Sequence, residues 1–184
     1  MPYKLLLILC FIMVSTFSFA KVALNIEQNL EKVEHYFLQE PENLPYEDII
    51  ALSRKVLGSR ENYTVQTLGK TFVLLADNAS NRGEDNEAFQ FAQDGLSLGG
   101  LNLSIKLNLL IKSAKGYYLK ENYEKTQILT TRVILMADSP EVLKYRLIAL
   151  SYRAMTYALQ SANDLAMKDI KQVDILIKTN PQYS

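Results

Sequence analysis

The chain has 184 residues, which is enough for one domain of ordinary size and too short for two large ones. Hydrophobic residues make up 48% of the sequence and charged residues 22%, as in a globular protein rather than a disordered chain. The 20 basic and 20 acidic side chains balance, so the positive excess typical of nucleic-acid binding is missing and we expect no nucleic-acid partner. One cysteine and one histidine leave few residues for metal or nucleophile chemistry, and we expect no metal and no cofactor.

Residues 1–20 have the three parts of a secretory signal peptide. Lys4 precedes a stretch of sixteen uncharged residues that begins with an apolar run, and Ser18 and Ala20 then supply small side chains before a cleavage point at Lys21. The stretch is shorter than the roughly 20 residues that span a bilayer as a helix, so we expect cleavage. An uncleaved segment is the alternative and the only expected contact with a membrane. The prediction is a periplasmic or secreted chain of residues 21–184.

Apolar residues after the leader recur at spacings of three and four, which is typical of α-helices, and no alternating pattern predicts a strand. Clusters of Pro, Gly, Asn and Ser interrupt the pattern at short intervals. They predict eight helices, at about 23–38, 46–58, 63–80, 85–97, 102–119, 123–137, 140–159 and 162–178.

Capping chemistry supports three of these boundaries. Ser139, followed by Pro140 and Glu141, places a hydroxyl at the N-cap and proline in the first turn. Ser161 is followed three residues later by an aspartate, the spacing of a capping box, so its hydroxyl is expected to cap the last helix. Gly83 can adopt the left-handed conformation that ends a helix.

Small residues repeat along the predicted helices. Three pairs lie twelve positions apart: Ala76 and Ala88, Ala114 and Thr126, and Ala154 and Ala166. The first members of these pairs are separated by 38 and 40 residues, and bulky Phe72, Leu110 and Leu150 precede them by four. Small residues let antiparallel helices approach closely, so the columns predict four stacked helix pairs at about 23–58, 63–97, 102–137 and 140–178. The first pair fits more loosely, and a single helical bundle is the alternative.

The segment from Ala114 to Thr126 resembles the centre of a tetratricopeptide repeat. It has a small residue, the aromatic Tyr117 three positions on, a short polar turn, the aromatic Tyr123, and a small residue at twelve. Tryptophan is absent, and Ser113 and Arg153 occupy positions where that family usually has leucine. Repeats of about 40 rather than 34 residues are similar to the divergent repeats of bacterial sensor proteins. The resemblance implies an all-α fold, a right-handed α–α superhelix of about four helix pairs.

The resemblance also implies a binding surface. In the tetratricopeptide family the first helix of each pair lines the concave face, and a set of positions around the small residue contacts the partner. These positions share one face of a helix. Carried onto this sequence they predict a protein- or peptide-binding surface at Lys70, Asp77, Asn108, Ile111, Lys115, Tyr118, Ser151, Met155 and Leu159. Tyr118 is the expected anchor, since large aromatic side chains with a polar tip dominate many interfaces.

We therefore expect a non-catalytic protein- or peptide-binding scaffold in the bacterial cell envelope. The alternative is a periplasmic sensory or ligand-binding module of a signalling system, such as the sensor part of a diguanylate cyclase. An enzyme is not expected, because His35 with Glu31 and Glu34 falls short of a metal constellation. Motifs for a nucleophile, a phosphate loop or a dinucleotide are absent from the sequence.

The last predicted helix, 162–178, lacks the polar outer face that the end of a repeat stack needs. Its expected packing side carries Leu165, Ala166, Ile170, Val173 and Ile177, and Met167 and Ile175 lie off that side. We expect this helix to leave apolar surface exposed, and to pair with another chain, such as a second copy, or with a part of the protein that the sequence does not include.

Overall fold

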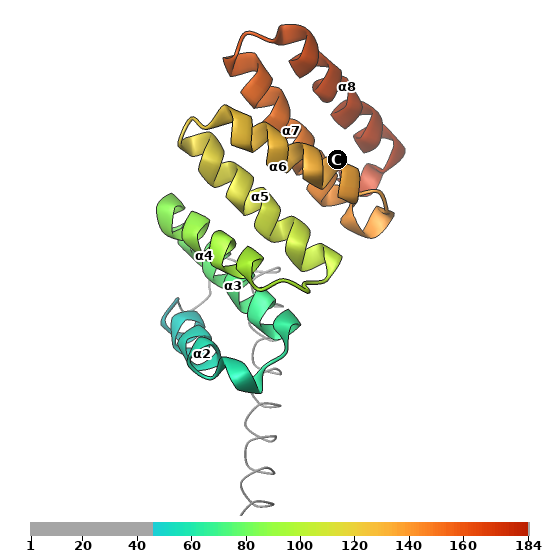
Figure 1. Ribbon diagram of the computed structural model, residues 1–184. Helices are drawn as coiled ribbons and strands as arrows, with labels where there is room; N and C mark the ends of the chain where they lie inside the picture. The colour runs from blue at the N-terminus through green and yellow to red at the C-terminus, as the bar shows by residue number, and fades with distance from the viewer. Residues whose placement is uncertain (1–45, 184) are drawn as a thin grey trace, which may run out of the picture. The chain divides into compact units, whose positions relative to one another are not determined.

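The computed structural model describes residues 46–183, and over this range the protein is all-α, as predicted (Figure 1). The described residues form seven α-helices and no β-strand. The helices are α2 (Tyr46–Gly58), α3 (Val65–Asn81), α4 (Asp85–Ser97), α5 (Leu103–Leu119), α6 (Tyr123–Met136), α7 (Leu143–Leu159) and α8 (Asn163–Thr179). Their bounds agree closely with seven predicted segments. The predicted leader 1–20, the predicted helix 23–38 and His35 lie outside the described residues.

The chain divides into two compact units, and the border lies within α3, between Thr71 and Phe72. The first unit includes α2 and the start of α3. Ile49, Ser53 and Val56 of α2 are buried, as their spacing of four and three on one helix face predicts. α3 begins after Thr64, whose hydroxyl oxygen accepts a hydrogen bond of 3.1 Å from the backbone N–H of Thr67.

In the second unit, α4 to α8 follow one another as neighbouring helices that reverse direction at each short connection (Figure 1). Each of these helices contacts the next, and α5 also contacts α7. The core of this unit lies among α5, α6 and α7 and includes Leu107, Leu110, Ile111, Val133, Ile134, Ala149 and Leu150. Because the connections between these helices are short, each helix packs against the helices that precede and follow it in the sequence.

The predicted columns of small residues are buried in this unit. All six residues of the twelve-residue pairs are at most 6% exposed. Two glycines continue the close packing, because a Cβ at Gly116 would overlap the ring of Phe89 and a Cβ at Gly95 would lie 2.8 Å from the side chain of Leu109. Both contacts join α4 to α5. The helices approach most closely where the sequence places its smallest side chains.

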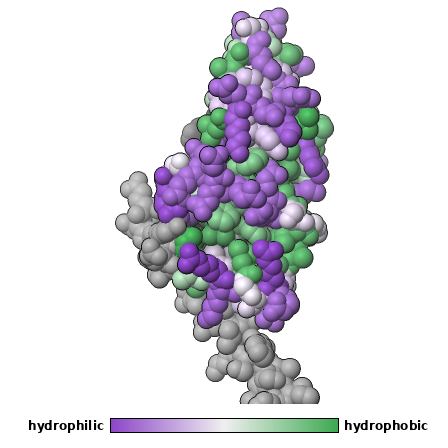
Figure 2. Space-filling view, turned by 60° about the vertical axis from the view of Figure 1, so that its left-hand side comes forward, coloured by the Kyte–Doolittle hydropathy of each residue, from purple (hydrophilic) through white to green (hydrophobic). Residues whose placement is uncertain are grey.

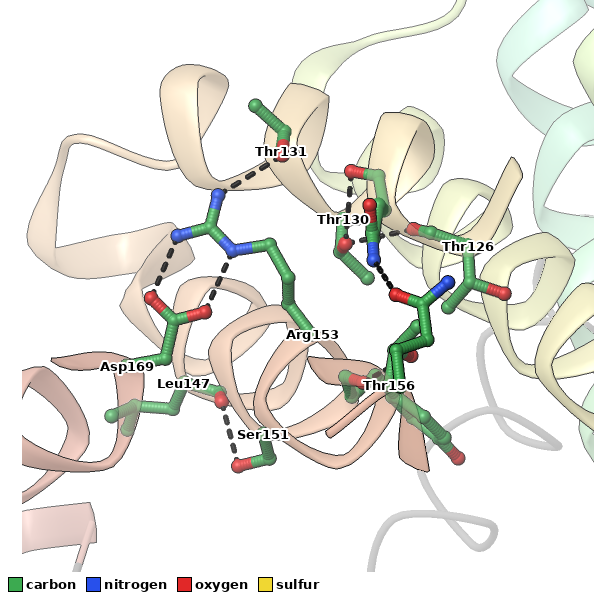
Figure 3. A network of polar contacts seen from close by, with 11 residues as sticks. Thr126, Thr130, Thr131, Leu147, Ser151, Arg153, Thr156 and Asp169 are labelled. Atoms are coloured by element: carbon green, nitrogen blue, oxygen red, sulfur yellow. Dashed lines mark hydrogen bonds and ion pairs between the residues drawn. The ribbon is translucent and has the colours of Figure 1, made fainter. Parts of the chain in front are cut away.

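Two departures from the tetratricopeptide pattern, Ser113 and Arg153, form polar bonds between helices, and Figure 3 shows those of Arg153. Arg153 of α7 donates to both carboxylate oxygens of Asp169 in α8, at 2.7 and 2.8 Å, and to the Thr131 hydroxyl in α6 at 3.0 Å. The hydrogen bond with Asp169 raises the pKa of the Arg153 guanidinium above its ordinary value. Ser113 of α5 accepts a hydrogen bond from Gln93 in α4. Ser113 and Arg153 occupy the same repeat position, and each is bonded to the preceding helix.

The predicted cap of the 140–159 helix is wrong. Pro140–Val142 form a 3₁₀ turn, and α7 begins only at Leu143. The Ser139 hydroxyl donates to the Glu141 carboxylate at 2.5 Å and makes no hydrogen bond to the backbone. The short Ser139 side chain is directed to the Glu141 carboxylate two residues away, so it does not accept a hydrogen bond from the unpaired N–H groups of the first helical turn.

The predicted capping box at Ser161 is also wrong. Ser161 has φ of 60°, and Ala162 occupies the N-cap position of α8 without a side-chain hydrogen bond. Gly83 has φ of 76°, so the left-handed conformation predicted for it is confirmed. The side chains that cap helices in the second unit are Asn102 at α5 and Asn122 at α6, which accept backbone hydrogen bonds of 3.0 and 3.1 Å.

α8 packs on the rest of the second unit through only part of the predicted face, since Ala166 is buried and Val173 packs against the core as predicted. Ala166 and Asp169 are buried, whereas Leu165 and Ile170, expected on the packing side, are 47% and 49% exposed. In this orientation Asp169 forms an ion pair with Arg153 of α7, and these two apolar side chains are exposed. Met167 and Ile175 are exposed as well, so α8 presents the apolar surface that was expected of it.

Candidate functional site

A partly enclosed cavity of about 260 Å³ lies along α5, on the side that faces the end of α3, the start of α4 and the middle of α7. Its apolar lining comes from Ala88, Ile111, Leu119 and Ile148, and its polar lining from Ser80, Asp85, Lys112, Lys115 and Tyr152. Two of the predicted site residues, Ile111 and Lys115, are part of this lining. All of these residues belong to the second unit.

Ion pairs balance the charge of this cavity. Lys112 of α5 pairs with Asp77 of α3. Lys115, one helical turn further on, lies 2.8 Å from a carboxylate oxygen of Asp85 and donates to the Ser80 hydroxyl at 2.7 Å. Each lysine has a carboxylate partner, so this surface does not present a field of one sign to a ligand.

Three tyrosines form one wall beside the cavity. The ring of Tyr118 packs edge-on against Tyr152, with centroids 5.7 Å apart, and lies 6.4 Å from the ring of Tyr123. Burial raises the pKa of the Tyr152 phenol above its ordinary value, so this side chain stays neutral at physiological pH. Tyr118 is half-buried, and the aromatic contacts hold its ring in place as a rigid, amphipathic surface.

The predicted residues of α7 are exposed. Met155 and Leu159 are 42% and 56% exposed, and Ser151 bonds only to the Leu147 carbonyl of its own helix, at 3.0 Å. Together with Leu119 and Ile148 of the cavity rim, Met155 and Leu159 make up an exposed apolar strip on the two contacting helices α5 and α7. We call these four residues the apolar strip.

The remaining predicted residues are placed less favourably for a ligand. Ile111 lines the cavity but is only 9% exposed and belongs to the hydrophobic core, and Asn108 is half-buried in α5. Asp77 is engaged with Lys112. Lys70 belongs to the first unit, so it is not part of the surface that the second unit forms.

Sequence reasoning missed Lys112 and Tyr152, which both line the cavity. Both lie two positions before a small residue of the repeat, Ala114 and Ala154. Their shared repeat position could have identified them, because it lies three residues before the predicted site positions Lys115 and Met155, and residues three apart share a helix face. Asp85, at the start of α4, has no such signal.

Figure 2 shows one face of the molecule coloured by hydropathy. Hydrophilic side chains cover much of this face, and hydrophobic groups gather in patches between them. A mixed surface of this kind is ordinary for a protein in water, so the assignment of a site depends on the cavity and the apolar strip.

No protein-family model matches the chain, and neither a curated protein nor a solved structure matches it. Within residues 46–183, none of the helices combines the length and the apolar character that a membrane span requires. The same range contains no group of three or more His, Cys, Asp or Glu residues that could hold a metal ion.

Proposed function

We propose that this chain is a non-catalytic helical repeat protein of the tetratricopeptide-like kind, and that it binds an extended segment of a protein or peptide. The binding surface is the side of the second unit that carries the cavity, the tyrosine wall and the apolar strip. The observation that carries the proposal is the apolar strip itself, because it lies beside a cavity whose two lysines are already paired with carboxylates.

The contacts support a specific kind of partner. Paired lysines and carboxylates offer little attraction to a polyanion, so most of the binding energy has to come from apolar burial and the tyrosines. An extended segment with two or three large apolar side chains would bury Met155 and Leu159 and place one side chain in the cavity. We propose such a segment as the ligand.

The superhelical arrangement of about four helix pairs is part of the proposal. Its support is the contact of each helix from α4 to α8 with the next, the contact between α5 and α7, and the equivalent bonds at Ser113 and Arg153. The proposed location is the periplasm or the exterior of a bacterial cell. Its support is the leader-like sequence of residues 1–20, and mass analysis of the purified chain tests it, since a chain that begins at Lys21 is expected and an intact Met1 would contradict cleavage.

Selection from a library of random peptides tests the binding function. The full-length chain is expected to select peptides rich in large apolar residues, and Met155→Glu/Leu159→Glu is expected to weaken their binding at least tenfold, because each substitution places a charge against the apolar ligand. The matched control is Ile128→Glu/Leu135→Glu, which changes two exposed apolar residues of α6. No saturable peptide, or an equal effect of both variants, would contradict the proposal.

A further inference from the structure

A second cavity, of about 410 Å³, lies along a different face of α5. It is bounded by α4, by the turn that joins α4 to α5, and by α6. On α5 it is lined by Lys106, Leu110, Ser113 and Tyr117, whereas the first cavity is lined by other residues of that helix, and the two share no lining residue. The size lies within the range of cavities that hold small molecules, about 300–1,000 Å³.

The charges of this cavity are not balanced. Lys106 of α5 and Arg132 of α6 both line it, and no acidic side chain does. Over residues 46–183 neither of these cations forms an ion pair. This contrasts with Lys112 and Lys115 of the first cavity, which both have carboxylate partners. A concave, partly apolar surface concentrates the field of unpaired cations and attracts an anion.

The rest of the cavity lining consists of a polar part, formed by Gln93 and Ser113, and an apolar wall. Ser113 is fully buried and accepts a hydrogen bond from Gln93, so its own hydroxyl hydrogen remains able to donate to a ligand. The apolar wall consists of the side chains of Leu96, Leu101, Leu110 and Leu129. Gly99 and Gly100 of the α4–α5 turn also line the cavity, and both have positive φ, of 65° and 62°. Their conformation favours glycine, so no side chain narrows the cavity there.

We propose that this cavity binds a small organic carboxylate, in which one anionic group is joined to a short aliphatic chain. The carboxylate would lie between Lys106 and Arg132, where guanidinium and ammonium groups form charge-assisted hydrogen bonds, and the aliphatic chain would pack on the leucines. A bare inorganic anion would leave the apolar wall uncovered, and an uncharged lipid would leave both cations without a partner. The site uses none of the residues proposed to bind a peptide.

Calorimetric titration of the full-length chain with hexanoate tests this site. Saturable binding is expected, and acetate, inorganic phosphate and 1-hexanol are each expected to bind at least tenfold more weakly, because each lacks either the aliphatic chain or the carboxylate. Lys106→Gln/Arg132→Gln is expected to weaken hexanoate binding at least tenfold while circular dichroism shows an unchanged helical fold. The control is Lys168→Gln/Lys171→Gln, which removes the same charge from two exposed positions of α8 and is expected to leave the affinity unchanged.

Three results would overturn the proposal. One is the absence of saturable hexanoate binding. Another is an equal loss of affinity in the two double variants, which would show a general charge effect. The third is acetate or phosphate binding as tightly as hexanoate, which would show that the leucine wall contributes nothing.

Discussion

Gly116 is the glycine at which adding a methyl group is expected to lower the stability of the fold most. Its missing side chain leaves room for the ring of Phe89, which is held edge-on against Tyr117 and lies under the Lys120 ammonium, 4.0 Å away. We expect Gly116→Ala to lower the free energy of unfolding by about 1–3 kcal/mol, although alanine favours a helix by about 1 kcal/mol over glycine. Urea unfolding followed by circular dichroism measures the change. The control is Gly58→Ala, where a Cβ meets no atom; equal effects of the two substitutions would contradict the close approach.

The ion pair between Arg153 and Asp169 gives a second prediction for single residues. Asp169 is only 2% exposed, so removing the guanidinium leaves a buried carboxylate without its partner. We expect Arg153→Met to cost about 3–5 kcal/mol and Arg153→Met/Asp169→Leu to recover most of that loss, since paired apolar groups replace a buried ion pair well. Chemical denaturation of the two variants measures both values. A double variant no more stable than the single one would show that Asp169 is stabilised by other groups.

At the scale of the helix, the spacing of small residues is the feature that the sequence could predict. Ala114 is fully buried where α5 meets its neighbours, so Ala114→Leu is expected to overpack the crossing and lower stability by about 1–3 kcal/mol. Ala158→Leu, at an exposed position of α7, is the control and is expected to change the melting temperature little. A melting temperature unaffected by Ala114→Leu would mean that the assigned repeat register is wrong.

Helix positions were predictable because breakers and periodicity act locally, and seven predicted segments match described helices. The caps at Ser139 and Ser161 were not predictable. The Ser139 hydroxyl bonds to the Glu141 carboxylate instead of the helix backbone, and Ser161 has a left-handed backbone conformation that keeps it out of the N-cap position. The exposed face of α8 was predicted only in part. Hydropathy assigned Ile170 to the packing side, but Ile170 is exposed and its neighbour Asp169 is buried in an ion pair with Arg153 of α7.

In the candidate site, too, positions along one helix were predictable and contacts between helices were not. The repeat register placed Lys115, Tyr118, Met155 and Leu159 on one surface, because positions along a helix are fixed by its geometry. It could not show that Asp77 and Lys112 pair across two helices, since that contact depends on the packing of α3 on α5. It also gave no indication of the second cavity. That cavity depends on Lys106 and Arg132, which are 26 positions apart and come together only in the folded chain.

At the scale of the whole molecule, the exposed apolar side chains of α8 lead to a prediction about association. Leu165, Met167, Ile170 and Ile175 remain exposed in the second unit, and apolar surface of this kind favours a contact with another chain. We expect sedimentation velocity of the full-length chain to show a dimer at tens of micromolar. Ile170→Lys is expected to shift the equilibrium toward the monomer, whereas Ile128→Lys on α6 is expected to leave it unchanged. A monomer at all concentrations would contradict self-association through α8.

A peptide or protein segment is proposed to bind along the side of α5 and α7 that carries the apolar strip. The most direct test of this binding is nuclear magnetic resonance of the isotopically labelled full-length chain, titrated with a peptide selected from the random library. We expect the largest chemical-shift changes at Tyr118, Tyr152, Met155 and Leu159, with little change at Ile128 and Leu135 of α6. Changes concentrated on α6 or α8, with the apolar strip unaffected, would contradict this proposal.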